Sequence, residues 1–213
     1  MLTVNHDLKT VERDLEHGRL PCPGCGGRLR GWGWARARII RARAGNRRVR
    51  PRRARCAGCL ATHVLLTVSL AARRADSAAV IASAIENKII HAHGHRRIAA
   101  TIGRPASTVR GWLRAFTACA DAITDRFTRL IVRHSPDAAG IWPAPASSPA
   151  GAALSALMGY AAGLGDRFGV GTLTWIRAGI AACHGRLFTA GFWTRPPTRT
   201  GSSTTSGPAG SLV

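Results

Sequence analysis

Acidic residues are scarce in this sequence, and their scarcity excludes one class of DNA enzyme. Nucleases and transposases that use two metal ions hold the ions with several carboxylates. No glutamate follows Glu86, and the aspartates after residue 115 are Asp121, Asp125, Asp137 and Asp166 only. The first two lie on an expected helix and the third opens an expected linker. The sequence also offers no catalytic nucleophile with a neighbouring general base, and no metal site with an open coordination position. It therefore predicts a protein that is not an enzyme.

Long apolar runs are also missing. Residues 138–165 carry no charge, but prolines and glycines interrupt them, and a membrane helix needs about 20 continuous apolar residues. The first residues are polar and amphipathic, unlike the apolar core of a secretory signal. We therefore expect no membrane partner and a cytoplasmic location, where thiols stay reduced and paired cysteines more often bind metal than form disulfides.

Lysine occurs only at positions 9 and 88, so arginine supplies nearly all of the positive charge. The formal net charge is +21, and residues 1–75 alone hold 17 Lys and Arg against 4 acidic residues. GC-rich coding explains the choice of arginine over lysine, but it does not explain why residues 28–55 contain no acid. A positive field concentrated in one part of the chain favours a polyanionic partner, most simply nucleic acid.

The six cysteines include two Cys-x-x-Cys pairs, Cys22 with Cys25 and Cys56 with Cys59. Two such pairs at this separation are typical of a four-thiolate zinc site. A redox Cys-x-x-Cys would begin a helix after a strand, whereas both pairs here lie in glycine-rich turns. A closed set of four sulfurs leaves no open coordination position, so we expect a structural Zn²⁺. His63 is the alternative ligand, although a strand position suits it better.

The thirty residues between the two pairs carry twelve arginines and no acidic residue. Strands are predicted at 28–35, 36–43, 47–55 and 62–66, with a hairpin turn at Gly45-Asn46. This order predicts a zinc ribbon over residues 20–70, in which the metal supplies much of the folding free energy. Residues 1–19 are predicted as a helical segment whose acidic face either packs beside the ribbon or faces solvent.

Residues 75–135 predict an all-α domain with a helix-turn-helix. Asp76 or Ser77 begins a helix that ends at Gly94, and its predicted buried stripe is Val80, Ile81, Ala84, Ile85 and Ile89. Gly103 suits a left-handed turn, and Pro105 suits the start of the next helix. The predicted core positions of this segment are Ile98, Ile102, Val109 and Trp112. The alternative is an ordinary helical hairpin with a glycine turn. In the helix-turn-helix interpretation the second helix enters the major groove of double-stranded DNA.

The exposed side of that second helix carries the candidate DNA-binding residues. Arg110 is the best candidate for bidentate recognition of a guanine. Other basic and small polar residues are better placed for phosphates. The complete candidate set is Arg96, Arg97, Arg104, Ser107, Thr108, Arg110 and Arg114.

The C-terminal half is less informative. An apolar seam from Ala120 to Ile131 either forms a homodimer surface or folds back onto the domain. Residues 136–150 are predicted as a linker, residues 151–194 as a weakly defined helical region, and residues 195–213 as a disordered tail. No function is predicted for this part of the chain.

The two cysteine pairs, Arg73-Arg74 and the stretch from His95 to Leu113 (HRRIAATIGRPASTVRGWL) resemble a family of actinobacterial proteins that join a zinc ribbon to a helix-turn-helix. The layout is also similar to the N-terminal DNA-binding region of insertion-sequence transposases, over roughly residues 10–135. The resemblance implies DNA binding connected with mobile elements, with a separately encoded recombinase as a further partner.

The predicted fold class is therefore α+β, with a small zinc ribbon followed by a helical domain. The leading hypothesis is a nucleoid-associated DNA-binding protein, either a transcriptional regulator or a transposase-associated recognition protein. One alternative is an RNA-binding ribbon in which Trp32 and Trp34 stack on unpaired bases. Another is a non-catalytic module whose zinc site only builds a protein-docking surface.

Overall fold

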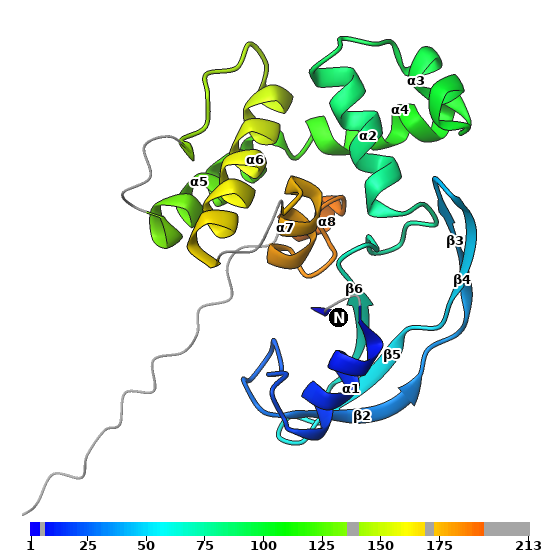
Figure 1. Cartoon of the computed structure of the whole chain (residues 1–213), viewed down its shortest axis with the longest axis vertical. Helices are drawn as coiled ribbons and strands as arrows, with labels where there is room; N and C mark the ends of the chain where they lie inside the picture. Colours follow the sequence, from blue (N-terminus) through cyan, green and yellow to red (C-terminus); the bar gives the residue numbers. More distant parts are fainter. Residues whose placement is uncertain (5–6, 136–140, 169–172, 194–213) are drawn as a thin grey trace, which may run out of the picture.

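The computed structural model describes residues 1–4, 7–135, 141–168 and 173–193. The fold is α+β, and the described residues contain eight helices and six strands. A small sheet covered by α1 forms one part of the molecule, and α2 to α8 form the other (Figure 1). The β3–β4 hairpin runs from the sheet toward α2, α3 and α4, and so connects the two parts (Figure 1).

The sheet has the strand order β1-β6-β5-β2. Its strands are β1 (Leu2–Val4), β2 (Leu29–Trp34), β5 (Arg52–Cys56) and β6 (Thr62–Thr67). The first strand pairs parallel with β6, which the sequence did not predict, and the other pairs are antiparallel. Helix α1 (Leu8–Glu16) begins after Asp7, whose carboxylate accepts hydrogen bonds from the backbone N–H groups of Lys9 and Thr10. Its Val11 and Leu15 are buried in the core cluster that contains Leu29 of β2.

The hairpin consists of β3 (Arg38–Ala42) and β4 (Gly45–Val49), with Arg43 and Ala44 as its two-residue loop. The predicted turn at Gly45-Asn46 is therefore wrong by two residues. Gly45 has a φ of +111° directly after the loop, a conformation that favours glycine. The end of β3 is held by a contact distant in sequence, because the Arg41 N–H donates to the Ala75 carbonyl at 2.8 Å. Local patterns contain no trace of that contact.

Helices α2 (Ala78–Ile89), α3 (His95–Ile102) and α4 (Ala106–Thr117) pack around a shared apolar centre. Of the predicted core positions, Ile81, Ile85, Ile98, Val109 and Trp112 are buried. Ile89 and Ile102 are only half-buried at the edge of the same cluster. Gly103 adopts the predicted left-handed conformation, with φ 64° and ψ 46°, between α3 and α4. Gly94 caps the start of α3, whereas the prediction used it to end α2.

The remaining helices are α5 (Ala120–His134), α6 (Pro149–Phe168), α7 (Trp175–Ala182) and α8 (Ala190–Trp193). The apolar seam of α5 packs on α6, with Phe127 and Tyr160 in an edge-to-face contact at 5.3 Å between ring centroids. Of the two interpretations of this seam, folding back onto the domain is the right one. Among the described residues, no helix is long and apolar enough to cross a bilayer.

The region that the sequence left weakly defined belongs to the largest core. Leu157 of α6 and Ile180 of α7 are fully buried in the same cluster as Ile81 of α2 and Val109 of α4. Of the predicted 136–150 linker, residues 141–150 are described, and helix α6 already begins at Pro149. The predicted tail at 195–213 lies outside the described residues.

Candidate metal centre and nucleic-acid interface

The four cysteines of the two pairs form one cluster. The sulfurs of Cys22, Cys25, Cys56 and Cys59 all lie within 4.8 Å of one another. The Cys22 and Cys59 Sγ atoms are 3.7 Å apart, and those of Cys25 and Cys56 are 3.5 Å apart. Four sulfurs at about 2.3 Å from a tetrahedral zinc are about 3.8 Å from one another. The cluster can therefore hold a metal ion, and its geometry is compatible with zinc.

Strand pairing brings the two cysteine turns together. Leu29 of β2 pairs with Cys56 of β5, so the turn before β2 lies against the turn after β5. Within the first turn, the Cys22 N–H donates to the Gly27 carbonyl at 2.7 Å, and the Gly26 N–H donates to the Cys22 carbonyl at 2.9 Å. These bonds close a tight loop around the sulfurs, as the glycine-rich sequence predicts.

Backbone N–H groups also point at the sulfurs. Hydrogen bonds from the backbone of Cys59 and then Gly58 lower the pKa of the Cys56 thiol to about 6. The Gly24 N–H donates to the Cys22 sulfur at 3.4 Å. Because the thiolate is the form that binds metal, these backbone contacts favour the metal-binding form of Cys56. The neighbouring Cys25 and Cys56 thiols raise the pKa of Cys59 to about 11.

His63 lies in β6, as the strand prediction expects, and its ring is buried against the cluster. The Nε2 atom is 3.4 Å from the Cys22 sulfur, and the four cysteines form a complete set without it. The histidine therefore lies beside the candidate ligand Cys22, and the cluster of four sulfurs is complete without it. Such outer contacts orient ligands and tune metal affinity.

Gly27 lies close against two of the cysteine sulfurs. A Cβ atom there would lie 3.1 Å from the Cys56 sulfur and 3.3 Å from the Cys25 sulfur. We expect Gly27→Ala to lower metal affinity by about tenfold or more, a typical loss when the surroundings of a ligand are disturbed. Competition with a chromophoric chelator measures the effect. Gly58→Ala is the matched control, because its Cβ would sit at 3.9 Å from both sulfurs. Equal affinities for the two variants would contradict the prediction.

Most of the predicted DNA-binding residues lie on open surface. Arg96 and Arg97 are exposed on α3, and Ser107, Arg110 and Arg114 are exposed on α4, with Thr108 half-buried. A shallow groove of about 440 Å³ runs between the end of α2, the start of α3 and α4. Its lining includes Lys88, His95, Arg110 and Arg114, and no acidic side chain.

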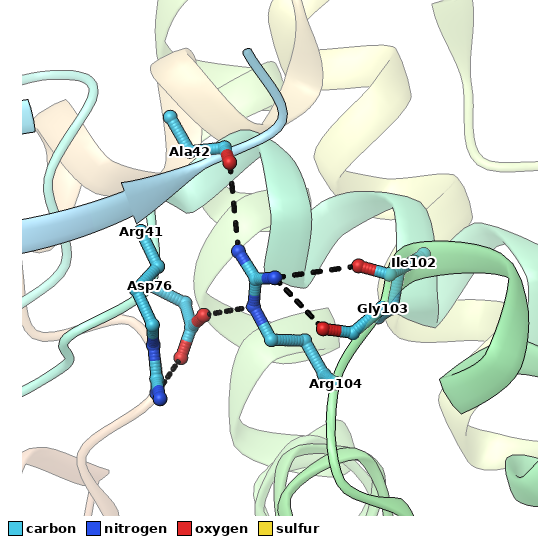
Figure 2. Close-up of polar contacts among 6 residues, drawn as sticks. All are labelled: Arg41, Ala42, Asp76, Ile102, Gly103 and Arg104. Atoms are coloured by element: carbon cyan, nitrogen blue, oxygen red, sulfur yellow. Dashed lines mark hydrogen bonds and ion pairs between the residues drawn. The ribbon is translucent and has the colours of Figure 1, made fainter. Parts of the chain in front are cut away.

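Arg104 is the exception among these residues. Its side chain is only 15% exposed, and its Nε is 2.6 Å from Oδ1 of Asp76. It also donates to the carbonyl oxygens of Gly103 at 2.9 Å and Ala42 at 3.5 Å (Figure 2). The guanidinium thus faces the β3–β4 hairpin, whereas the prediction directed it toward a phosphate. One sequence signal pointed to Asp76, which is the only acidic residue between Glu16 and Glu86.

The hairpin keeps most of its arginines unpaired. Within the described part of the chain, no acidic partner is found for Arg43, Arg47, Arg48 or Arg50, all of which are exposed. Burial lowers the pKa of Arg38, whose Nε and Nη2 atoms have no acceptor among the described residues. The hairpin therefore presents cations with free donors.

Two arginines of β5 are arranged differently. Arg52 is 2.7 Å from Glu12 of α1, so the acidic helix does pack beside the ribbon. Arg52 also stacks over Trp34, at 5.1 Å from guanidinium carbon to ring centroid, and Arg55 stacks over Trp32 at 4.8 Å. Both tryptophans are about half exposed. Their rings pack against arginine guanidinium groups on β5.

Comparison with known families gives one match. A family model described as a domain of unknown function (DUF6431) matches residues 22–112. The matched segment begins at the first cysteine of the cluster and ends at Trp112 in the core of α4. No curated protein matches the chain. No solved structure matches it either. The description carries no activity, and the resemblance to transposases gains no support from it.

Proposed function

We propose that this protein is a non-catalytic, sequence-specific binder of double-stranded DNA, in which a structural zinc supports a ribbon and a helix-turn-helix reads the bases. The observation that carries the proposal is the open face of α4, where Arg110 and Arg114 line a basic groove and Ser107 is exposed. A cationic helix face with no acidic neighbours is the electrostatic footprint of a nucleic-acid surface.

The packing of α3 on α4 leaves that face free. Ile98 of α3 and Val109 and Trp112 of α4 are buried toward the core, so the opposite side of α4 is uncovered. The left-handed turn at Gly103 sets the angle between the two helices. A major groove about 12 Å wide admits one helix.

The roles of the remaining residues follow from their places. Arg110 lies in the second turn of α4 and suits bidentate contact with a guanine. Arg96 and Arg97 in the first turn of α3, and Ser107 and Thr108 in the first turn of α4, suit phosphate oxygens. Together these contacts describe a transcriptional regulator or a transposase-associated recognition protein, bound to the nucleoid.

Arg110→Ala tests the base-reading role. We expect the variant to lose preference at one base pair, at a cost of about 1–3 kcal/mol for the preferred sequence, while affinity for other sequences changes little. Selection from a randomised duplex library, followed by titration of the selected site, measures both quantities.

Arg129→Ala is the matched control, since Arg129 is an exposed arginine on α5 with an ion pair to Asp125. It should leave the selected sequence unchanged. If Arg110→Ala selects the same site with the same discrimination as the original protein, α4 does not read bases through Arg110.

A second candidate function rests on Trp32 and Trp34. Each ring is about half exposed and stacked by an arginine, an arrangement that suits stacking on unpaired bases of RNA. Competition between a duplex DNA and a single-stranded RNA of equal length separates the two candidates. Absence of salt-sensitive binding to either would favour a protein-docking module.

A further inference from the structure

We propose that the β3–β4 hairpin and α4 bind one continuous DNA duplex, and that Asp76 is the positioning residue that holds them in a fixed relation. This inference rests on the proposed function. It assigns the exposed hairpin arginines to phosphates flanking the groove that α4 enters. It also gives the buried carboxylate of Asp76 a positioning role, whereas its place before α2 suggests only a helix cap.

Asp76 lies at a joint between three segments. Its side chain is 3% exposed, and each carboxylate oxygen is 2.6 Å from a different arginine. Arg41 comes from the hairpin and Arg104 from the turn between α3 and α4 (Figure 2). One negative charge therefore connects two positively charged elements that would otherwise repel each other.

Backbone bonds strengthen the same joint. The Arg41 N–H donates to the Ala75 carbonyl at 2.8 Å, and the Ser77 N–H donates to the Arg41 carbonyl at 3.0 Å. Ile40, the preceding residue in β3, is buried with Leu66 and Leu70. The hairpin is thus anchored along its inner side, and its loop projects beside the α3–α4 turn.

Basic residues of both elements lie next to this joint. Arg43 opens the hairpin loop, directly after Ala42, whose carbonyl is 3.5 Å from an Arg104 nitrogen. Helix α4 begins at Ala106, shortly after Arg104. Duplex DNA carries one phosphate charge per about 1.7 Å of its axis, so two neighbouring basic elements meet adjacent phosphates of one duplex.

The extent of the family match agrees with a single unit. Residues 22–112 include the cysteine cluster, the hairpin, Asp76 and α4, on both sides of the joint. A ribbon that bound a separate polyanion would need no rigid connection to the α3–α4 turn. The buried carboxylate with two arginine partners provides that connection.

The test compares three variants on a duplex of about 30 base pairs, roughly three helical turns, that carries the selected site at its centre. Replacing Arg43, Arg47 and Arg48 by alanine should lower the slope of log affinity against log salt by up to about 3, near 0.9 for each lost phosphate contact. The nuclease footprint on the selected site should shorten on one flank. Asp76→Asn should shorten the same flank while the base preference set by Arg110 stays.

Combining the two changes should cause little further loss, because the hairpin contacts are already gone without Asp76. Metal content and helical circular dichroism establish that each variant is folded. If Asp76→Asn does not fold, Arg104→Lys serves in its place, since it keeps the charge and removes the planar fork.

Two results would overturn the inference. One is a triple variant whose salt slope and footprint equal those of the original protein. The other is a folded Asp76→Asn or Arg104→Lys protein with a full-length footprint. If the original protein does not retain duplex DNA at all, the proposed function itself fails. If the original protein binds DNA with a preference that depends on Arg110, but the variants leave the footprint flank unchanged, only this inference fails.

Discussion

Removal of the metal is expected to unfold the sheet region and weaken retention of DNA. A chelator in excess, or the substitution Cys56→Ser, should remove one bound zinc per chain. The apolar cluster under the sheet is small and has Val11, Leu15 and Leu29 at its centre. Structural zinc contributes about 10–16 kcal/mol in zinc-finger peptides at neutral pH, more than such a cluster supplies.

The loss should extend to the hairpin, although its residues do not touch the cysteines. Strand β5 carries Cys56 and follows β4 directly, so release of the cluster frees the base of the hairpin. Hydrogen exchange should therefore report lost protection from β2 to β6, while α2 to α7 keep theirs. Salt-sensitive binding to duplex DNA should fall in parallel.

Cys119→Ala is the appropriate control for this experiment. Cys119 is buried in the helical core and takes no part in the cluster. Its replacement should leave the zinc content at one per chain. Full protection of β2 to β6 after chelation, or a normal zinc content in Cys56→Ser, would rule out a structural metal in this protein.

Local patterns predicted the parts of the fold that depend on neighbouring residues. The two Cys-x-x-Cys spacings predicted the cluster, because tight turns set where each pair of sulfurs lies. Gly103 predicted the left-handed turn, because residues with a side chain rarely adopt that conformation. The burial of Ile81, Ile85 and Val109 followed from helical periodicity.

Long-range pairing supplied what the sequence did not reveal. Leu2–Val4 forms a strand only because β6 lies beside it, about sixty residues later. The hairpin loop at Arg43 and Ala44 is set partly by bonds from Arg41 to the segment before α2. Asp76 had a local role available as a helix cap, and its actual arginine partners are 28 and 35 residues away.

The same limit explains the misjudged direction of Arg104. A basic residue in a helix-turn-helix turn suggests a phosphate contact when only its neighbours are considered. A single buried acid on a distant segment redirects it, because a buried carboxylate needs charged partners. In a chain with so few acids, each acidic position is informative about architecture.

The C-terminal helices are expected to determine the stability of the proposed DNA-reading helices. Leu157 of α6 is fully buried. Leu157→Ala should lower the free energy of unfolding by about 2–5 kcal/mol, the usual cost of this change in a packed core. The total free energy of unfolding of natural domains is only about 5–15 kcal/mol. The variant should therefore be only marginally stable at physiological temperature.

The loss of stability should extend to α2 and α4, because α7 packs against α6 and also against α2 and α4. Gly179 of α7 lies so close to Leu157 that a Cβ there would be 2.9 Å from its Cδ2. One turn earlier, the Trp175 indole N–H donates to Glu86 of α2 at 2.6 Å. The Trp175 ring also contacts Phe116 of α4, with centroids 6.5 Å apart.

Denaturant unfolding followed by tryptophan fluorescence gives the stability change, since Trp112 and Trp175 both lie in this core. Met158→Ala is the matched control, because Met158 is the next residue along α6 and is 45% exposed. It should change stability by less than about 0.5 kcal/mol. Hydrogen exchange should show α2 and α4 losing protection together with α6 in Leu157→Ala. Protection lost from α5, α6 and α7 alone would mean that α2 to α4 form an independent unit, and that the C-terminal region only packs beside them.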